Sequence, residues 1–369
     1  MKSLKNIPGW RSRQKLVVFN VDDYGNVRIA SPAAHEALTK AGLAVDGRFD
    51  RLDTLETRAD LEALLEVLDS VRDKAGQGAV FTPYSLSANP DFDALRGTPD
   101  QYRYEDLPQS FARLSSEDPD AYEGAWALWQ EGIARGLLQP EFHGREHLNL
   151  RLLEHKLARR DADAIANIAV KSMAGLRDDP ASPGVGFTHA FGLADKADLA
   201  QHREILSDGL ALFERVFGRP ATCFTPPAQR LHPDLYAFLE GQGIRAIDKP
   251  LHTVRQLDRG KTRREVNFLG RKRGQGHVTL VRNVVFEPNL RPGTDEVART
   301  LSQIAAAFRW GKPAMISSHR VNFCGHIDPA NRRDGLDALK RLLQGIVQRW
   351  PDVEFIGAGE LARRIEAGR

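Results

Sequence analysis

Short apolar runs of strand length alternate with helical patterns along almost the whole chain, and this alternation limits the folds open to it. The first run, KLVVFNV at 15–21, precedes a helical pattern in which Ser31 is the expected N-cap and Pro32 the first helical residue. Helices are also predicted over 57–76, 118–137 and 198–218, and strands over 79–83, 140–143, 221–227, 244–248, 314–319 and 353–357. Repeated β–α units predict an α/β fold with a parallel sheet, closed into a barrel or open.

Two segments interrupt the alternation. The sequence around Arg273-Gly274-Gln275-Gly276 has strand-like residues on both sides and predicts an inserted β-hairpin near 264–286. Residues 84–117 show little periodicity and predict a long loop, a kind of segment that is often functional in compact domains. No Pro/Gly/Ser-rich linker divides the chain, so we expect a single domain over residues 1–369.

The charge balance and the length of the apolar runs exclude several classes of protein. Lys and Arg total 52 and Asp and Glu total 49, a net charge of +3 that does not point to nucleic acid or a membrane surface. No apolar run approaches the roughly 18–20 residues of a membrane span, and residues 1–15 lack the apolar core of a secretory signal. Two cysteines, Cys223 and Cys324, provide no disulfide framework. We therefore expect a cytoplasmic protein with no nucleic-acid partner and no integral membrane segment.

Acidic and imidazole side chains are concentrated where the predicted strands end. Asp22 and Asp23 follow the first strand, His143 ends the strand at 140–143, and His319 ends the strand at 314–319. Ligands bind at the carboxyl ends of the strands in parallel α/β folds, so these side chains are expected to share one face. If the chain turns helical at the end of the 140–143 strand, His143 and His147 project from one side of that helix, within reach of one metal ion.

Two histidines and one carboxylate form the ligand set of hydrolytic zinc enzymes and of non-haem iron sites. One carboxylate of the Asp22–Asp23 pair would complete the set, and the other would be free to act as a base. Each motif alone has an ordinary explanation: a turn or helix cap for the Asp pair, a surface helix for the His pair, and a satisfied core histidine for His319. Their combination at the ends of different strands favours the metal site.

The segments NVDDYG, FHGREH and ISSH resemble the motifs of the polysaccharide deacetylase superfamily, and PDVEFIGAGEL resembles that family's last strand and helix. The phrase FHGREHLN is similar to an uncharacterised branch of deacetylase-like proteins, and the DDYG form is similar to the diacetylchitobiose deacetylases. The match runs in order from about residue 15 to 365. It implies a single distorted (β/α)7 barrel.

The resemblance implies a role for each of these side chains. Asp22 would be the general base and His319 the general acid. Asp23, His143 and His147 would hold one divalent metal ion, with Zn²⁺ as the favoured ion. The residues expected to contact the substrate are Arg145, Asn149, Pro226, Arg282, Arg320 and Asn322.

The function implied is that of a metal-dependent hydrolase that removes an N-acetyl or other small acyl group from an amino-sugar substrate, either a glycan or a glycan precursor. Two alternatives remain. The same barrel can act on an ester, formamide or glycosidic bond, or the chain can be a catalytically silent, glycan-binding relative. The basic residues from Arg259 to Arg273 form either a solvated face or a contact for a carrier-linked or anionic carbohydrate.

Three positions depart from the family pattern. Gly144 replaces a Ser or Thr between the two histidines. Thr225 occupies the position of an arginine that orients the base, and the candidates to substitute for it are Arg145, Arg282 and Arg320. Asp248 is the candidate for the acidic residue that tunes the general acid, although a turn at a strand end is the favoured interpretation.

Overall fold

The computed structural model describes residues 4–98, 101–180, 182, 184–256, 262–273, 276–291 and 293–368. The strands are β1 Leu16–Tyr24, β2 Phe81–Leu86, β3 Ala88–Pro90, β4 Tyr104–Asp106, β5 Glu141–Gly144, β6 Cys223–Phe224, β7 Ala246–Asp248, β8 His252–Gln256, β9 Thr262–Val266, β10 Lys272–Arg273, β11 His277–Leu280, β12 Val284–Val285, β13 Ala314–His319 and β14 Glu354–Phe355.

The helices follow the same alternation. They are α1 Pro32–Lys40, α2 Arg48–Leu52, α3 Arg58–Asp69, α4 Phe92–Gly97, α5 Leu107–Glu117, α6 Pro119–Tyr122, α7 Ala125–Ala134, α8 Leu150–Ala158, α9 Ala162–Ala169, α10 Asp198–Phe217, α11 Tyr236–Gly241, α12 Glu296–Arg309, α13 Pro329–Arg349 and α14 Ala358–Glu366. None of the described helices is both long and apolar enough to cross a membrane.

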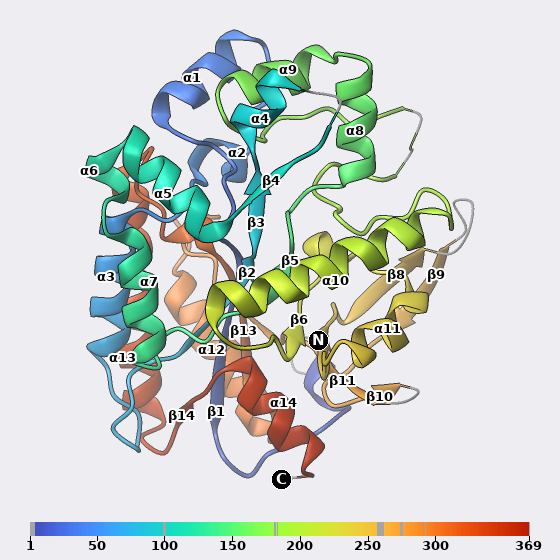
Figure 1. The fold of residues 1–369 in the computed structure, drawn as a ribbon. Coiled ribbons are helices and arrows are strands. Elements are labelled where there is room, and N and C mark those ends of the chain that lie inside the picture. Colours follow the sequence, from blue (N-terminus) through green and yellow to red (C-terminus); the bar gives the residue numbers. More distant parts are fainter. Residues whose placement is uncertain are drawn as a thin grey trace.

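Eight parallel strands form a half-barrel in the order β11-β7-β6-β5-β2-β1-β13-β12. β14 pairs with β1 in parallel, and β10 adds an antiparallel strand next to β11. Helices α3, α7 and α13 lie together along one flank of this sheet, and α10 crosses it (Figure 1). The prediction of a distorted α/β barrel is confirmed.

The central strand β1 shows why the sheet is covered on both faces. All of its residues are buried, as expected for a parallel strand with an almost continuous apolar sequence. The Phe19 ring stacks on Phe81 of the neighbouring strand, with 5.2 Å between the ring centroids. The polar residues of β1 are therefore confined to places where a specific partner receives them, and its carboxyl end carries Asp22 and Asp23.

Several predicted boundaries agree with the structure. The Ser31 side chain accepts a hydrogen bond from the Ala34 N–H and so caps α1. Helix α10 ends at Gly218, whose φ of 68° gives the left-handed C-cap that favours glycine. The helix predicted over 57–76 is shorter, because α3 ends at Asp69. The helix predicted over 118–137 is divided, because Gly124 has a φ of 80° between α6 and α7.

The prediction of a long loop over 84–117 is wrong. This segment holds part of β2, the β3–β4 hairpin and helices α4 and α5. β3, β4 and α4 are too short to show periodicity, whereas the 11 residues of α5 bury Leu107, Phe111 and Leu114 at helical spacing, and both helices begin with clear caps. Asp91 caps α4, and Asp106 with Gln109 forms a capping box at the start of α5.

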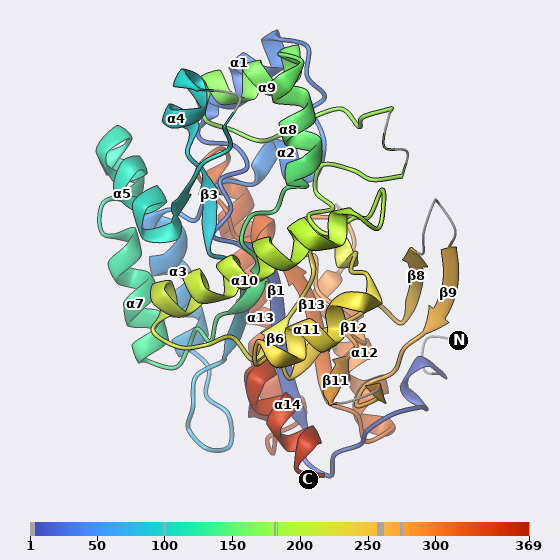
Figure 2. The same ribbon diagram turned by 45° about the vertical axis from the view of Figure 1, so that its right-hand side comes forward.

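The hairpin prediction near 264–286 is confirmed in part. β10 and β11 pair antiparallel, although β11 also joins the main sheet beside β7. A separate hairpin, β8–β9, precedes it and stands away from the main sheet at the right of Figure 2. Gly274 and Gln275 of the predicted turn, and Arg259 and Lys261 of the basic segment, lie outside the described residues.

Candidate metal centre and catalytic groups

The two adjacent carboxylates at the end of β1 face different partners. The pairing of β1 with β2 shifts register between Val21 and Tyr24, and Asp23 has a φ of 73°. Such a left-handed conformation is uncommon for a residue other than glycine and is concentrated at functional sites. The Asp22 carboxylate meets Arg282, whereas the Asp23 carboxylate meets two histidines. One local irregularity of the strand thus separates two carboxylates that would otherwise repel each other.

His143 and His147 converge on Asp23. Their Nε2 atoms lie 3.4 and 3.2 Å from Asp23 Oδ1, and all three side chains are buried. The expectation of a helix at this point is wrong, since His143 belongs to β5 and α8 begins only at Leu150. The two rings come together because the chain turns sharply after the strand.

The donor set fits a divalent metal ion. His143 Nδ1 lies 2.7 Å from the backbone oxygen of Thr225, and a carbonyl only accepts, so Nδ1 carries the proton. The buried Nε2 atom of His143 has no hydrogen-bond partner, and in the neutral imidazole with its proton on Nδ1 this is the nitrogen available to a metal ion. The three ligand atoms lie within 4.8 Å of one another. An imidazole oriented by a carbonyl and aimed at a carboxylate is typical of a metal ligand.

The geometry of the turn between the two histidines explains why a glycine occupies position 144. Its φ is 128°, a conformation that residues with a Cβ rarely adopt. A Cβ at this position would lie 3.3 Å from the Glu146 oxygen and 3.5 Å from Pro227 Cγ. The Ser or Thr of the family pattern would therefore be strained in this loop.

Arg282 orients Asp22. Its Nη1 and Nη2 donate to the two carboxylate oxygens of Asp22, each at 2.7 Å, and its Nε forms an ion pair with Asp248 at 2.7 Å. Thr225 Oγ1 accepts a further bond from Nη2 at 3.2 Å. Of the three candidate arginines, Arg282 is therefore the one that contacts Asp22.

The positive charge of Arg282 keeps the Asp22 carboxylate ionised. Burial raises the pKa of Asp22, but the charge and hydrogen bonds of Arg282 outweigh burial and hold the pKa below its ordinary value. Asp248, which was expected to be a turn residue, is instead a buried partner of the same guanidinium. Burial raises the pKa of Asp248 to about 6 against the opposing charge of Arg282.

His319 lies next to Asp22 because the two residues are register partners in β13 and β1. Its Nδ1 is 2.6 Å from Glu287 Oε1, and its Nε2 is 3.9 Å from Asp22 Oδ2. Burial opposes protonation of the imidazole, but the hydrogen bond and charge of Glu287 outweigh it, helped by Asp23 and Asp22, and raise the pKa of His319 to about 9. The residue that tunes His319 is thus Glu287, and Asp248 does not contact it.

Glu287 is the main site residue that sequence reasoning missed. Its second oxygen, Oε2, accepts from Arg48 at 2.6 Å and from Asn322 at 2.9 Å, which fixes the carboxylate. The available signal was positional. Glu287 lies two residues beyond β12, much as Asp22 and Asp23 lie at the carboxyl end of β1, but β12 has only two residues and belongs to the segment predicted as a hairpin.

A cavity of about 430 Å³ lies in front of these groups. It is lined by Asp22, Asp23, Arg28, Phe49, His143, His147, Thr188, Thr225, Pro226, Ala228, Gln229, Arg282, Ser317 and His319. Pro226 and Arg282, two of the six predicted substrate contacts, are among them.

The other four predicted contacts do not line this cavity. Arg145 donates to Glu146 and Asp208, and the Asn149 side chain caps α8. Arg320 is buried behind the site in ion pairs, and Asn322 supports Glu287. Protein groups already hydrogen-bond these four side chains.

Replacing Glu287 by glutamine is expected to lower the pKa of His319 from about 9 toward its ordinary value of 6.5. The folded protein holds the His319 proton more tightly than the unfolded chain. The contact therefore stabilises the fold fully below pH 6.5, and this stability is lost as the pH rises through about 9. NMR titration of the imidazole in metal-free protein measures the pKa. Glu141→Gln is the matched control, since that buried carboxylate binds Thr222 and Cys223. An unchanged pKa in Glu287→Gln would contradict the assignment.

The sequence matches no protein-family model and no curated protein. Solved structures match it over nearly its whole length. The Puue allantoinase structure gives a TM-score of 0.50 at 12% identity, covering 97% of this chain and 92% of that one. A protein assigned as a polysaccharide deacetylase from Mycobacterium smegmatis gives 0.48 at 12% identity over 98% and 93%. Another so assigned, from Pseudomonas aeruginosa PAO1, gives 0.48 at 11% over 94% and 89%.

These similarities concern the fold. The chain shares the overall fold of the allantoinase structure, and at this level of identity no family or branch is distinguished. Within that fold it carries a buried Asp-His-His cluster, the one group of this kind among the described residues.

Proposed function

We propose that the chain is a single catalytic domain that acts as a metal-dependent hydrolase, removing an N-acetyl or other small acyl group from an amino-sugar substrate. In this proposal Asp23, His143 and His147 hold one divalent ion, with Zn²⁺ favoured. The observation that carries it is the unpartnered Nε2 of His143, directed at Asp23 beside a separately oriented carboxylate, Asp22.

The protein groups have distinct tasks in this reaction. Asp22, kept ionised by Arg282, accepts the proton of the attacking water. His319, whose Nδ1 is held by Glu287, presents Nε2 to the cavity and donates a proton to the departing amine. A bound divalent ion supplies Lewis acidity toward the acyl oxygen and the water. The base and the acid lie side by side, as required for proton removal and proton return within one small cavity.

A catalytically silent relative is less well supported. A silent relative would be favoured if no arginine oriented the base, because Thr225 replaces the arginine of the family pattern. Arg282, at another strand end, supplies a guanidinium to the base carboxylate instead. Hydrolysis of a different amide on the same fold remains the second candidate. The similarity of this fold to the allantoinase structure favours including allantoin among the test substrates.

The first test is the metal content of native protein and of His143→Ala, both purified without chelators. We expect about one equivalent of zinc or a similar ion in the native protein and its loss in the variant. His155→Ala is the control, because His155 is exposed on α8. Acetylated amino sugars are then assayed for acetate and free amine. Folded native protein that takes up no divalent ion on titration would overturn the proposal.

A further inference from the structure

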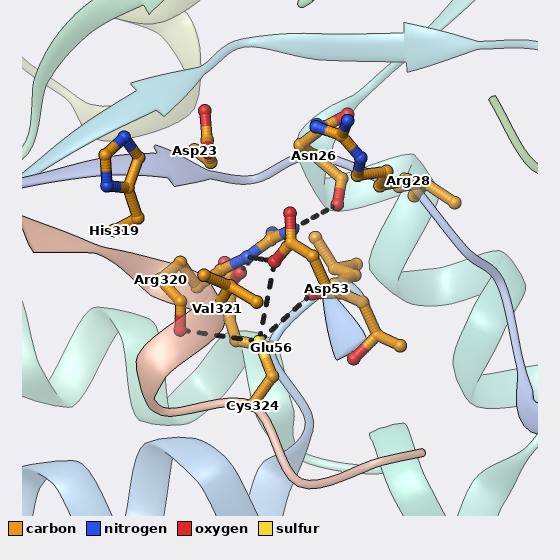
Figure 3. Close-up of polar contacts among 12 residues, drawn as sticks. Asp23, Asn26, Arg28, Asp53, Glu56, His319, Arg320, Val321 and Cys324 are labelled. Atoms are coloured by element: carbon orange, nitrogen blue, oxygen red, sulfur yellow. Dashed lines mark hydrogen bonds and ion pairs between the residues drawn. The ribbon is translucent and has the colours of Figure 1, made fainter. Parts of the chain in front are cut away.

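One cationic side chain of the cavity has no part in the proposed reaction. Three cationic or imidazolium groups other than the metal-binding pair line it: Arg282, His319 and Arg28. Arg282 is engaged by Asp22 and Asp248, and His319 is engaged by Glu287. Arg28 remains, on the segment that continues from Asp23 through Asn26 (Figure 3).

The contacts of Arg28 leave part of its guanidinium free for a ligand. Its Nε donates to Asp50 Oδ1 at 2.7 Å, and its side chain is 14% exposed. Within the described part of the chain, no hydrogen bond joins its two terminal nitrogens to a protein acceptor. Asp50 thus fixes the side chain, while the two N–H groups that suit a carboxylate or phosphate remain available.

Phe49 connects Arg28 to the catalytic groups. The guanidinium carbon of Arg28 lies 5.4 Å from the centroid of the Phe49 ring, and the same ring meets His319 edge-on at 5.1 Å. All three side chains line the cavity. A group bound by Arg28 would therefore share this small cavity with the proposed proton donor, separated from it by one aromatic ring.

The remaining charges of the cavity favour an anionic ligand once a divalent ion is bound. Asp22 and Asp23 are its only carboxylates among the described residues; Arg282 neutralises the first and the ion neutralises the second. Thr188, Thr225, Pro226, Ala228, Gln229 and Ser317 are neutral. Asp50 and Asp53 also act on the charge of Arg28, but they lie outside the cavity lining, so no further lining carboxylate faces an anion there.

Resting on the proposed function, we infer that Arg28 binds an acidic group of the substrate. The substrate class is then an acyl amide that carries a carboxylate or a phosphate, such as an acylated amino sugar acid or sugar phosphate. This recognition site lies inside the cavity and is distinct from the basic segment before Arg273.

The test compares the affinities of zinc-loaded protein for D-glucuronate, D-glucose 6-phosphate and D-glucose by calorimetry. None of these probes contains an amide, so no turnover interferes. We expect one of the two anions to bind about tenfold or more tightly than glucose, and Arg28→Met to abolish that preference. The preferred anion identifies the acidic group as carboxylate or phosphate.

Arg113→Met is a closely matched control. Arg113 also pairs with a carboxylate, Glu105, and lies over a phenylalanine ring, but it does not line the cavity. Its variant should keep the full preference. Equal binding of the three probes, no detectable binding of either anion, or a preference that survives Arg28→Met would each overturn the inference.

Hydrolysis assays separate this inference from the proposed function. An acetylated hexosamine and the corresponding acetylated aminouronic acid differ only in the acidic group. If both are hydrolysed equally and no anion preference is seen, the proposed hydrolase function is supported and the role of Arg28 in binding an acidic group is ruled out. If neither is hydrolysed but binding depends on Arg28, the recognition site stands and the proposed reaction falls.

Discussion

Replacing Asp22 by asparagine is expected to lower kcat about a thousandfold while the protein keeps its metal ion. Asparagine has nearly the same shape, but its amide cannot accept the proton of the attacking water. The carboxylate of Asp22 is ionised at neutral pH because Arg282 holds its pKa below the ordinary value against the effect of burial. The measurement is kcat with an acetylated amino sugar, together with metal content by mass spectrometry.

Asp248→Asn is the matched control for this prediction. Asp248 contacts the same guanidinium as Asp22 but does not line the cavity. Its loss should reduce kcat much less, since Arg282 keeps both hydrogen bonds to Asp22. A kcat for Asp22→Asn within about tenfold of the native value would show that another group accepts the proton.

The residues of the metal centre could be predicted because parallel strands end at the same edge of a sheet. Asp23, His143 and His319 come from three strands, and each directly ends or follows an apolar run that is recognisable in the sequence. The spacing argument for His143 and His147 named two residues that the structure brings together, but it did so through a helix that is not present. A turn at Gly144 brings the pair together, and the three residues between the histidines place the imidazole centroids 5.1 Å apart without a helix.

The partners of these residues could not be predicted from local patterns. Arg282 binds Asp22 from 260 positions away, and one of three candidate arginines could be chosen only after the sheet order was known. Glu287 follows a strand of two residues, which is too short for any periodic signal. The error over 84–117 has the same origin for β3, β4 and α4, which are too short for a periodic signal. Helix α5 is different, because its capping box at Asp106 and its apolar residues Leu107, Phe111 and Leu114 are recognisable in the sequence.

Behind the site, Arg320 organises a buried ionic cluster that ties the end of β13 to the loop after β1 (Figure 3). It is 1% exposed and forms ion pairs with Asp53 and Glu56, each at 2.9 Å, and its Nη2 donates to the Asn26 oxygen at 2.8 Å. Glu56 also accepts from Trp129 Nε1 at 2.8 Å. One guanidinium therefore compensates two buried carboxylates and holds the backbone three residues beyond Asp23.

Arg320→Met is expected to reduce the free energy of unfolding by about 3–5 kcal/mol, because it leaves both carboxylates buried and uncompensated. Burial already raises the pKa of Asp53 to about 6 with Arg320 present. Without the arginine this pKa rises further, so the folded variant retains a proton that the folded native protein releases above about pH 6, and the deficit relative to the native protein grows as the pH rises above about 6.

Urea unfolding at pH 5 and at pH 7.5 measures both effects, with Arg135→Met as the control. Arg135 forms half-exposed ion pairs with Asp69 and Glu131, and such pairs contribute about 1 kcal/mol or less. Adding Asp53→Asn to Arg320→Met should recover part of the loss, since it removes one of the uncompensated charges. A deficit no larger than that of Arg135→Met, or one that does not change with pH, would mean that water or a neighbouring group compensates the carboxylates. The end of β1 that carries Asp23 would then be held in its strained conformation by the metal centre rather than by this cluster.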